Sequence, residues 1–271
     1  MAMWNIVKQE EMDLILSGKY TSKELSKKLN RHCGTINKIA RENNVKLPRK
    51  YTRLYKIKED FFDTPTEESS YILGFIAADG CILEGKNKKP SIVEISLAEK
   101  DRNHLLKMKN MISVDVPLKE IKKTNAVRCS LCSIKLAESL VKKGIMPRKS
   151  LTLKFPDIPK EYIRHFIRGY FDGDGYIRER GNRRFKYIYS VLEVSMLGTK
   201  WFLEDIKEEF YLIYGNKVGS LKSCEKWYNA HRLTFSTKSA IEFCKWIYSD
   251  CSIKLDRKFE VYNNFIKKKE E

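Results

Sequence analysis

The 271-residue sequence lacks several features that would assign it to common protein classes. No apolar run approaches the roughly 20 residues that a helix needs to cross a bilayer, which excludes a transmembrane helix. Met1–Asn5 show no charged start followed by an apolar run, so we expect no secretory signal. The seven cysteines are odd in number and scattered, which favours a reducing compartment over a disulfide framework. We therefore expect a cytoplasmic protein with no membrane partner.

Zinc-binding patterns are also missing from the sequence. Cys129 and Cys132 form the only C-x-x-C pair, and a structural zinc site would need a second pair at a suitable spacing. We interpret these two cysteines as buried structural thiols, because free cysteine behaves in proteins as a small hydrophobic residue.

Acidic residues are few relative to basic ones. The chain has 53 Lys and Arg against 35 Asp and Glu, a formal net charge of +18 and a pI near 9.5. Nucleic acid is the usual partner of such a chain, since phosphates that are neutralised release their counterions. The alternative is a lysine-rich surface that only keeps the protein in solution. With 42% hydrophobic residues, 14 Tyr and 13 Phe, the chain can build a large core, which excludes global disorder.

The first 48 residues carry the pattern of a small helical domain. A short helix is predicted over 9–17 and ends at Gly18. The segment Thr21–Glu24 matches a capping box, which predicts the start of a second helix. A third helix is predicted over 33–43, after a break at Asn30–His32. Three short helices with a tight turn between the last two resemble a helix-turn-helix.

The third predicted helix presents side chains that suit base edges and phosphates. These outward positions are Thr35, Asn37, Lys38 and Arg41. Residues 1–60 contain 14 Lys and Arg against 7 Asp and Glu, which favours DNA binding. The alternative is a three-helix bundle that packs on the rest of the chain. We predict a helix-turn-helix domain over 1–48 and a basic, Pro-bounded linker over 49–66.

The remainder of the chain contains an internal repeat. Three segments of a first copy recur in a second copy at offsets of 95, 99 and 109 residues, namely Tyr71–Gly80 as Phe166–Gly175, Val93–Leu97 as Leu192–Met196, and Pro147–Lys149 as Asp256–Lys258. A slowly growing offset is expected when hairpin loops differ in length between two copies of one unit. We therefore predict two repeats, over 67–150 and 151–271.

Each repeat is expected to fold as helix, hairpin, helix, hairpin, helix. Apolar residues alternate at Val93, Ile95 and Leu97, which is typical of a strand, and again in the matching segment of the second copy. Helical periodicity is clear over 101–112, 135–143, 200–213 and 238–248. The predicted fold class is α+β, with duplicated αββαββα units that form a pseudo-two-fold saddle, preceded by the small all-α helix-turn-helix domain.

The repeated ten-residue segments are apolar helices with small residues four positions apart. These are Gly74 and Ala78 in the first copy and Gly169 and Gly173 in the second. Because a glycine inside a helix costs about 1 kcal/mol relative to alanine, some other interaction must offset this cost in both copies. Small residues at this spacing let two helix backbones approach closely. We predict that these four residues form the interface between the two helices.

Each of these helices ends in Asp-Gly. Gly80 and Gly175 suit a left-handed residue that closes a helix. Asp79 and Asp174 lie at the negative end of the helix dipole, and in paired helices the two carboxylates would converge. Two such carboxylates need a cation, and oxygen ligands suit Mg²⁺ or Ca²⁺ rather than zinc. We predict a metal site formed by both aspartates with backbone oxygens of Ala78 and Gly173. The alternative is two ordinary helix ends with surface aspartates.

Ile72–Gly80 and Ile167–Gly175 resemble the two nine-residue motifs of LAGLIDADG homing endonucleases. The connecting segment, Gly144–Leu151 followed by Phe155–Pro159, is similar to that of single-chain members, and the resemblance covers roughly residues 67–265. In this family the penultimate acidic residue of each motif binds the metals, which implies Asp79 and Asp174. The first motif departs from the pattern at its sixth position, Ala77, where the second has Asp172. This position is not the metal ligand, and we expect a weaker capping or interface contact there.

The resemblance also implies residues around the DNA. Basic residues near the scissile phosphates map onto Lys135 and Lys238, although both could equally be helix-start lysines on a solvated face. The hairpins would lie along the major groove and contact it through Lys86, Asn87, Lys88, Lys89, Arg178, Arg180, Arg183, Arg184 and Lys186. The alternative is that these loops carry only solvated charge.

Together these features predict a monomeric, site-specific, Mg²⁺-dependent double-strand DNA endonuclease with a long asymmetric target. Ca²⁺ would bind at the same site without supporting cleavage. Such a protein would serve a mobile element in a bacterium or phage, or in an organellar matrix. The alternatives are a non-cleaving DNA-binding regulator and an RNA maturase that binds its intron.

Overall fold

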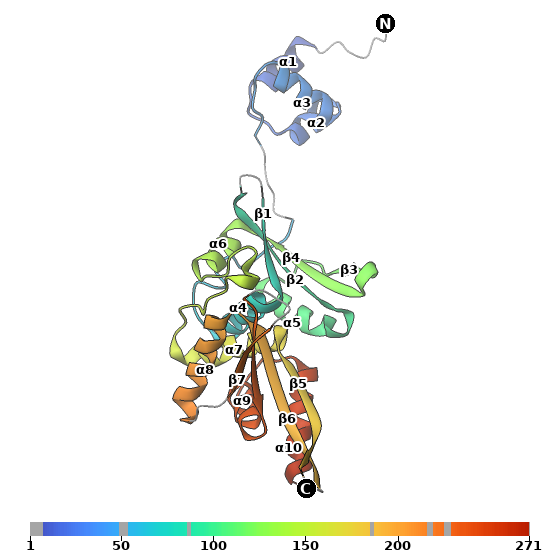
Figure 1. Cartoon of the computed structure of the whole chain (residues 1–271). Coiled ribbons are helices and arrows are strands. Elements are labelled where there is room, and N and C mark those ends of the chain that lie inside the picture. Colours follow the sequence, from blue (N-terminus) through green and yellow to red (C-terminus); the bar gives the residue numbers. More distant parts are fainter. Residues whose placement is uncertain are drawn as a thin grey trace. The chain divides into compact units, whose positions relative to one another are not determined.

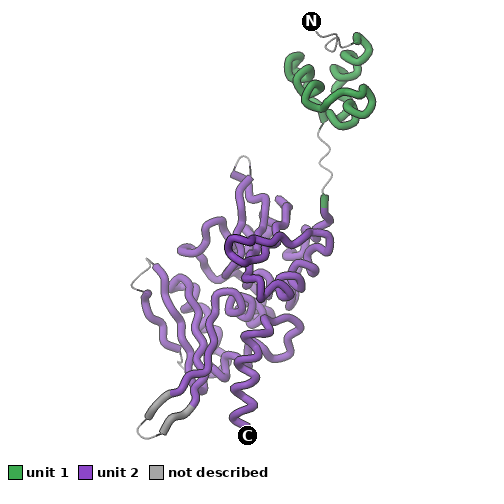
Figure 2. The backbone as a smooth tube through the Cα atoms, turned by 90° about the vertical axis from the view of Figure 1, so that its right-hand side faces the viewer, with its two compact units in different colours: residues 1–54 green, residues 55–271 purple. Residues whose placement is uncertain are grey.

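The computed structural model describes residues 8–48, 54–85, 88–184, 187–215, 219–224 and 229–270, with the side chains of 182–189 outside the description. The chain divides into two compact units, Met1–Leu54 and Tyr55–Glu271 (Figure 2). Among the described residues, no helix is both long and apolar enough to cross a membrane.

The first unit is the predicted three-helix domain, with α1 (Gln9–Leu16), α2 (Ser22–Leu29) and α3 (Cys33–Glu42). Its capping box is present, because the Thr21 side chain accepts a hydrogen bond from the Glu24 amide at 3.2 Å and the Glu24 carboxylate accepts one from the Thr21 amide at 2.9 Å. One buried apolar cluster holds the helices together, formed by Ile15, Leu25, Ile36, Ile39 and Ala40.

The predicted linker is too long. Arg49–Arg53 lie outside the described residues, but residues 55–66 belong to the second unit. The Lys56 amide donates to the Asp115 carboxylate at 3.3 Å, and the Lys56 carbonyl accepts a hydrogen bond from the Ser113 hydroxyl. Phe62 is only 1% exposed. The basic and proline residues suggested a solvated connector, but the aromatic residues between them pack into the core.

The second unit repeats one arrangement twice (Figure 1). The first half consists of α4 (Glu67–Asp79), β1 (Gly80–Glu84), β2 (Pro90–Ala98), α5 (Arg102–Ile112), β3 (Lys119–Ile121), β4 (Ala126–Cys132) and α6 (Ile134–Lys142). The second half consists of α7 (Lys160–Asp174), β5 (Tyr176–Arg184), β6 (Tyr187–Gly198), α8 (Lys200–Tyr214), β7 (Ser220–Ser223), β8 (His231–Ser236) and α9 (Lys238–Tyr248), followed by α10 (Asp256–Glu270). The predicted duplicated αββαββα fold is confirmed.

Each half contains a four-stranded antiparallel sheet, in the orders β1-β2-β4-β3 and β5-β6-β8-β7. The alternating apolar residues face inward, with Val93, Ile95 and Leu97 buried on β2 and their counterparts buried on β6. Cys129 is also buried on β4, whereas Cys132 is exposed. The prediction that both thiols are buried is therefore wrong for Cys132, because residues three apart on a strand face opposite sides.

Helices α4 and α7 pack directly against each other at the centre of the second unit (Figure 1). A Cβ atom at Gly74 would overlap the Phe166 carbonyl, and one at Gly169 would overlap the Tyr71 carbonyl. Phe166 is the repeat counterpart of Tyr71, so the two contacts are equivalent. A Cβ at Gly173 would lie 2.5 Å from the Ala78 Cβ. The structure thus places all four small residues at the helix interface, in a pseudo-two-fold arrangement.

Candidate active site

The paired helices α4 and α7 end at Asp79 and Asp174, and each is followed directly by a strand. Gly80 and Gly175 are in extended conformation, with φ of −81° and −76°. The prediction that a left-handed glycine closes each helix is therefore wrong. Gly80 is the first residue of β1, and Gly175 directly precedes β5. Glycine suits these positions for another reason, since a Cβ would crowd Ile76 in the first half and Phe171 in the second.

The two aspartates lie close to each other. The Asp79 Oδ2 atom would be 3.7 Å from a Cβ at Gly173, the residue that precedes Asp174. Desolvation by surrounding protein and then the charge of Asp79 raise the pKa of Asp174 to about 6. Desolvation also raises the pKa of Asp79, while Lys258 and Lys149 oppose this effect. Asp79 and Asp174 are both exposed residues, so their carboxylates are partly desolvated and still accessible.

Two buried lysines approach the same helix ends. The Lys149 ammonium donates to the Gly80 carbonyl, and Lys258 donates to the carbonyls of Phe171 at 2.7 Å, Asp172 at 2.9 Å and Gly173 at 3.3 Å, and also to that of Gly175. Each lysine therefore places a positive charge at the negative end of a motif helix. Burial lowers the pKa of Lys258 to about 8 and also lowers the pKa of Lys149.

A shallow cleft opens beside each carboxylate. The cleft at Asp79 has a volume of about 300 Å³ and is lined by Ser96–Ala98 of β2, by Lys100 and Arg257, and by two further carboxylates, Asp101 and Asp172. The cleft at Asp174 has a volume of about 270 Å³ and is lined by Ser195–Leu197 of β6, together with Arg232. The two strand segments are related by the same repeat offset of 99 residues. Both clefts therefore have a helix-end aspartate, an equivalent strand segment and a basic side chain, but the cleft at Asp79 also holds Asp101 and Asp172.

Comparison with known proteins agrees with this architecture. Residues 161–207 match the family model of the LAGLIDADG-like domain. The LAGLIDADG meganuclease I-AabMI, solved with uncleaved DNA, is 14% identical with a TM-score of 0.51, covering 74% of this chain and 91% of that one. The LAGLIDADG homing endonuclease I-LtrWI, solved with target DNA, is 12% identical with a TM-score of 0.51, covering 74% and 90%.

The second unit has the LAGLIDADG endonuclease fold. The resemblance is confirmed by the fold and, at the second motif, by the family model, and the aspartates that it singled out are the last residues of the paired helices α4 and α7. A segment of 121 residues is also 28% identical to the probable translation initiation factor IF-2 of Methanocaldococcus jannaschii. That match covers 42% of this chain and only 9% of the relative's length.

The carboxylates at the ends of α4 and α7 suit Mg²⁺ better than a metal that takes all of its ligands from the protein. Within the described ranges, no group of three or more His, Cys, Asp and Glu side chains could hold a metal. Mg²⁺ needs no such group, because it usually binds one or two carboxylates, retains several waters and takes further oxygens from substrate phosphates. Asp79 and Asp174 supply two carboxylates, and the predicted backbone oxygens of Ala78 and Gly173 belong to the residues directly before them. The Gly173 carbonyl already accepts a hydrogen bond from Lys258, which leaves it one further lone pair.

The two lysines chosen from the sequence lie elsewhere. The Lys135 ammonium pairs with Asp63 at 3.9 Å, and that of Lys238 pairs with Glu242 at 3.6 Å, with 60% and 85% of the lysine side chains exposed. Lys149 and Lys258 are instead the lysines whose charges act on Asp174. Their signal was present in the repeat itself, since Pro147–Lys149 and Asp256–Lys258 both keep Arg-Lys at equivalent positions.

The residues expected to contact DNA through the hairpins are only partly described. Lys86, Asn87 and Lys186 lie outside the described residues, as do the side chains of Arg183 and Arg184. Lys88 and Lys89 are exposed next to the turn between β1 and β2. Arg178 and Arg180 of β5 both pair with Glu193 of β6, at 2.8 and 3.1 Å. This carboxylate fixes the two guanidinium groups on the outer face of the strand and offsets part of their charge.

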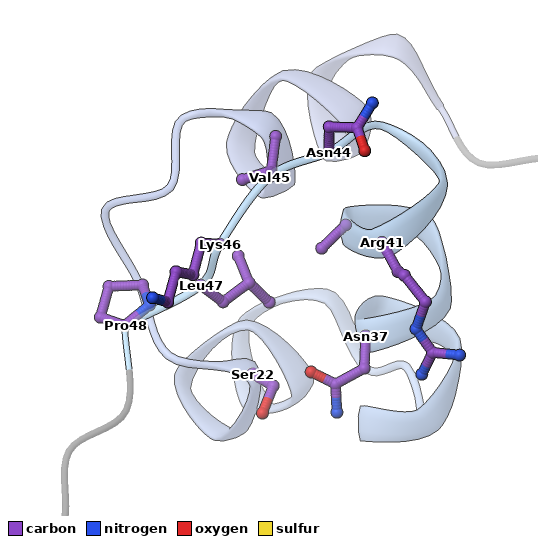
Figure 3. A pocket seen from close by; sticks show the side chains of 9 residues that line it. Ser22, Asn37, Arg41, Asn44, Val45, Lys46, Leu47 and Pro48 are labelled. Carbon is purple, nitrogen blue, oxygen red and sulfur yellow. The ribbon is translucent and has the colours of Figure 1, made fainter.

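In the first unit, the predicted recognition residues Thr35, Asn37, Lys38 and Arg41 are all exposed on α3. Asn37 and Arg41 line a cleft of about 860 Å³ together with Ser22 of α2 and the tail Asn44–Pro48 (Figure 3). This cleft has no acidic side chain in its lining, and Lys46 adds a second cation. It is larger than the two clefts at the aspartates.

Proposed function

We propose that the chain is a site-specific, Mg²⁺-dependent endonuclease that cuts both strands of double-stranded DNA. The observation that supports this most directly is the convergence of Asp79 and Asp174 at the ends of two paired helices, each beside a buried lysine and its own cleft. Two equivalent half-sites in one chain match the need to hydrolyse one phosphodiester in each strand.

Double-stranded DNA is the substrate that the charge and the fold favour. A net charge of +18 gives strong attraction to phosphates. Meganucleases of the same fold have been solved with DNA bound, among them I-AabMI with uncleaved DNA and I-LtrWI with its target. The exposed arginines of β5 lie on a strand that could enter the major groove, which admits a two-stranded ribbon.

The residues of each half-site have distinct roles in this proposal. Asp79 and Asp174 would hold Mg²⁺, which activates water and stabilises the leaving oxygen when it is bound there. Lys149 and Lys258 offset the charge of the carboxylates and of the helix ends, so that an anionic phosphate can enter each cleft. The basic side chains at the cleft walls, Lys100 in one and Arg232 in the other, would hold that phosphate.

The test is to incubate the protein with Mg²⁺ and a randomised DNA library, and to sequence the newly formed ends. We expect cleavage at one long recurring sequence. Asp79→Asn and Asp174→Asn should each abolish double-strand cleavage while the affinity for that sequence, measured in Ca²⁺, stays within a few-fold. Full cleavage by either variant would refute the assignment. Specific binding with no cleavage by the unaltered protein would instead indicate the regulator, and preferential binding of a structured intron RNA would indicate the maturase.

A further inference from the structure

Asp172 has a carboxylate with an unusually complete set of partners. It is 1% exposed and accepts hydrogen bonds from the Tyr71 hydroxyl, the Tyr248 hydroxyl and the Leu255 amide, each at 2.8 Å. The donors come from α4, from the end of α9 and from the residue before α10. A buried carboxylate is tolerated only when it is hydrogen-bonded in this way, so these three segments are held in one arrangement.

This network fixes the start of α10, the helix that carries Lys258. Leu255 directly precedes α10, and Lys258 lies in its first turn. Arg257 adds a second anchor, since its guanidinium donates to both oxygens of Asp101 at 2.9 and 3.1 Å. With the helix start held at two points, the Lys258 ammonium is directed at the carbonyls of Phe171, Asp172 and Gly173.

The first copy of the repeat cannot form the same network around Lys149. The residue equivalent to Asp172 is Ala77, whose methyl group accepts no hydrogen bond. Lys149 lies in a short 3-10 turn, Lys149–Leu151, rather than in the first turn of a long helix. Its ammonium donates to the Gly80 carbonyl, whereas Lys258 reaches four carbonyls. The two lysines therefore occupy equivalent positions with different degrees of constraint.

We propose that Asp172 is a positioning residue that holds Lys258 in place, so that the half-site of Asp79, whose cleft is lined by Asp172, Leu255 and Arg257, cuts its DNA strand before the half-site of Asp174 cuts the other. This inference rests on the proposed endonuclease function. A lysine held in its working position loses little freedom when the substrate binds, and a misplacement of about 1 Å costs on the order of 100-fold in rate. The better-held half-site should therefore act first.

The test uses the full-length protein and a duplex that carries its target, with each strand labelled separately. We expect the unaltered protein to cut one strand first. Asp172→Ala should slow that strand by about 100-fold and leave the other within a few-fold. Lys258→Ala should slow the same strand, and Lys149→Ala, the matched control, should slow the opposite one. A double variant of Asp172→Ala and Lys258→Ala should be no slower than Lys258→Ala alone, because Asp172 acts through this lysine. Equal slowing of both strands by Asp172→Ala would overturn the inference.

A second measurement does not depend on cleavage. Brief treatment with acetic anhydride, followed by mass spectrometry, reports how accessible each lysine amine is. We expect Lys258 to be protected in the unaltered protein, to react several-fold faster in Asp172→Ala, and to be largely protected in Asp172→Asn, which keeps an acceptor oxygen of the same shape. Lys149 should react at one rate in all three proteins. If the unaltered protein cuts neither strand, the endonuclease proposal fails while this labelling still decides the role of Asp172. Unchanged labelling of Lys258 would refute that role.

Discussion

Asp174 combines its position at a helix end with an unfavourable charge. Its pKa is raised from 3.8 to about 6 by desolvation and by the charge of Asp79. A carboxyl whose folded pKa exceeds its unfolded value contributes stability that is complete below the unfolded pKa and is lost as the pH rises through the folded pKa. Without metal, the folded protein should therefore lose stability between about pH 4 and pH 7.

We predict that Asp174→Asn raises the melting temperature of the metal-free protein at pH 7.5 and has little effect at pH 4.5. The amide keeps the shape of the side chain and removes the repulsion with Asp79. The measurement is scanning calorimetry in EDTA at both pH values, with exposed Asp157→Asn as the control that should change neither. A gain of the same size at both pH values would show that charge is not the cause.

Single residues also show which parts of the candidate site could be predicted from the sequence. Asp79 and Asp174 were identifiable because each ends a contiguous repeated motif, and their position at a helix end has direct electrostatic consequences. Lys149 and Lys258 belong to the repeated Arg-Lys pair, but the repeat alone does not show that they reach the helix ends, because each contact forms through tertiary folding, across 69 residues for Lys149 and Gly80 and 87 for Lys258 and Phe171. Local spacing does not report contacts at such separations, and the assignment of Lys135 and Lys238 to the scissile phosphates stays a prediction.

At the scale of elements, the pairing of α4 and α7 decides whether the two aspartates meet. Glycine at the centre of a helix costs about 1 kcal/mol relative to alanine, so at an exposed position Gly→Ala would stabilise the protein. At Gly74 and Gly169 the added methyl would overlap a carbonyl of the facing helix, and overpacking typically costs about 1–3 kcal/mol. The helices can accept the methyl only by moving apart.

We therefore predict that Gly169→Ala lowers the free energy of unfolding by about 1–3 kcal/mol and slows cleavage of both strands together. Gly74→Ala should do the same, because the two contacts are equivalent. Urea unfolding and strand-resolved cleavage measure the two effects. A variant that is more stable than the unaltered protein would contradict the close packing of these helices.

The three-helix unit has an apolar core separate from that of the LAGLIDADG unit. We predict that removal of Met1–Leu54 leaves cleavage in place, weakens DNA affinity and shortens the protected footprint at one end. Asn37→Ala combined with Arg41→Ala, which changes only the exposed face of α3, should shorten the footprint at the same end. An unchanged footprint in both proteins would show that this unit does not bind DNA.

The helices of this unit were predictable from local capping and periodicity, whereas its boundary depended on where Phe62 packs.

At the scale of the whole molecule, the two halves share a backbone plan but present different charges. Glu94 of β2 and Glu193 of β6 are repeat counterparts, and each is largely buried. Glu94 pairs with Arg128 of β4 at 3.4 Å, whereas Glu193 pairs with Arg178 and Arg180 of β5. The arginine paired with Glu94 therefore lies on an inner strand of its sheet, whereas the arginines paired with Glu193 lie on an edge strand. Since side chains at base edges carry sequence specificity, the two halves should read different sequences.

We predict that the protein binds DNA as a 1:1 complex at a long target that is not a palindrome. Both carboxylates that a two-strand cut requires are already in one chain, on helices that pack on each other, so a second copy is not needed. Replacing one half of the target with the inverted copy of the other should reduce cleavage strongly, because one sheet would then face the wrong bases, and each mismatched base pair typically costs about 1–3 kcal/mol. Sedimentation of the complex with labelled DNA gives the stoichiometry, and cleavage of the two symmetrised targets gives the specificity. A 2:1 complex on a perfect palindrome would contradict the single-chain, two-half arrangement on which the active site was built.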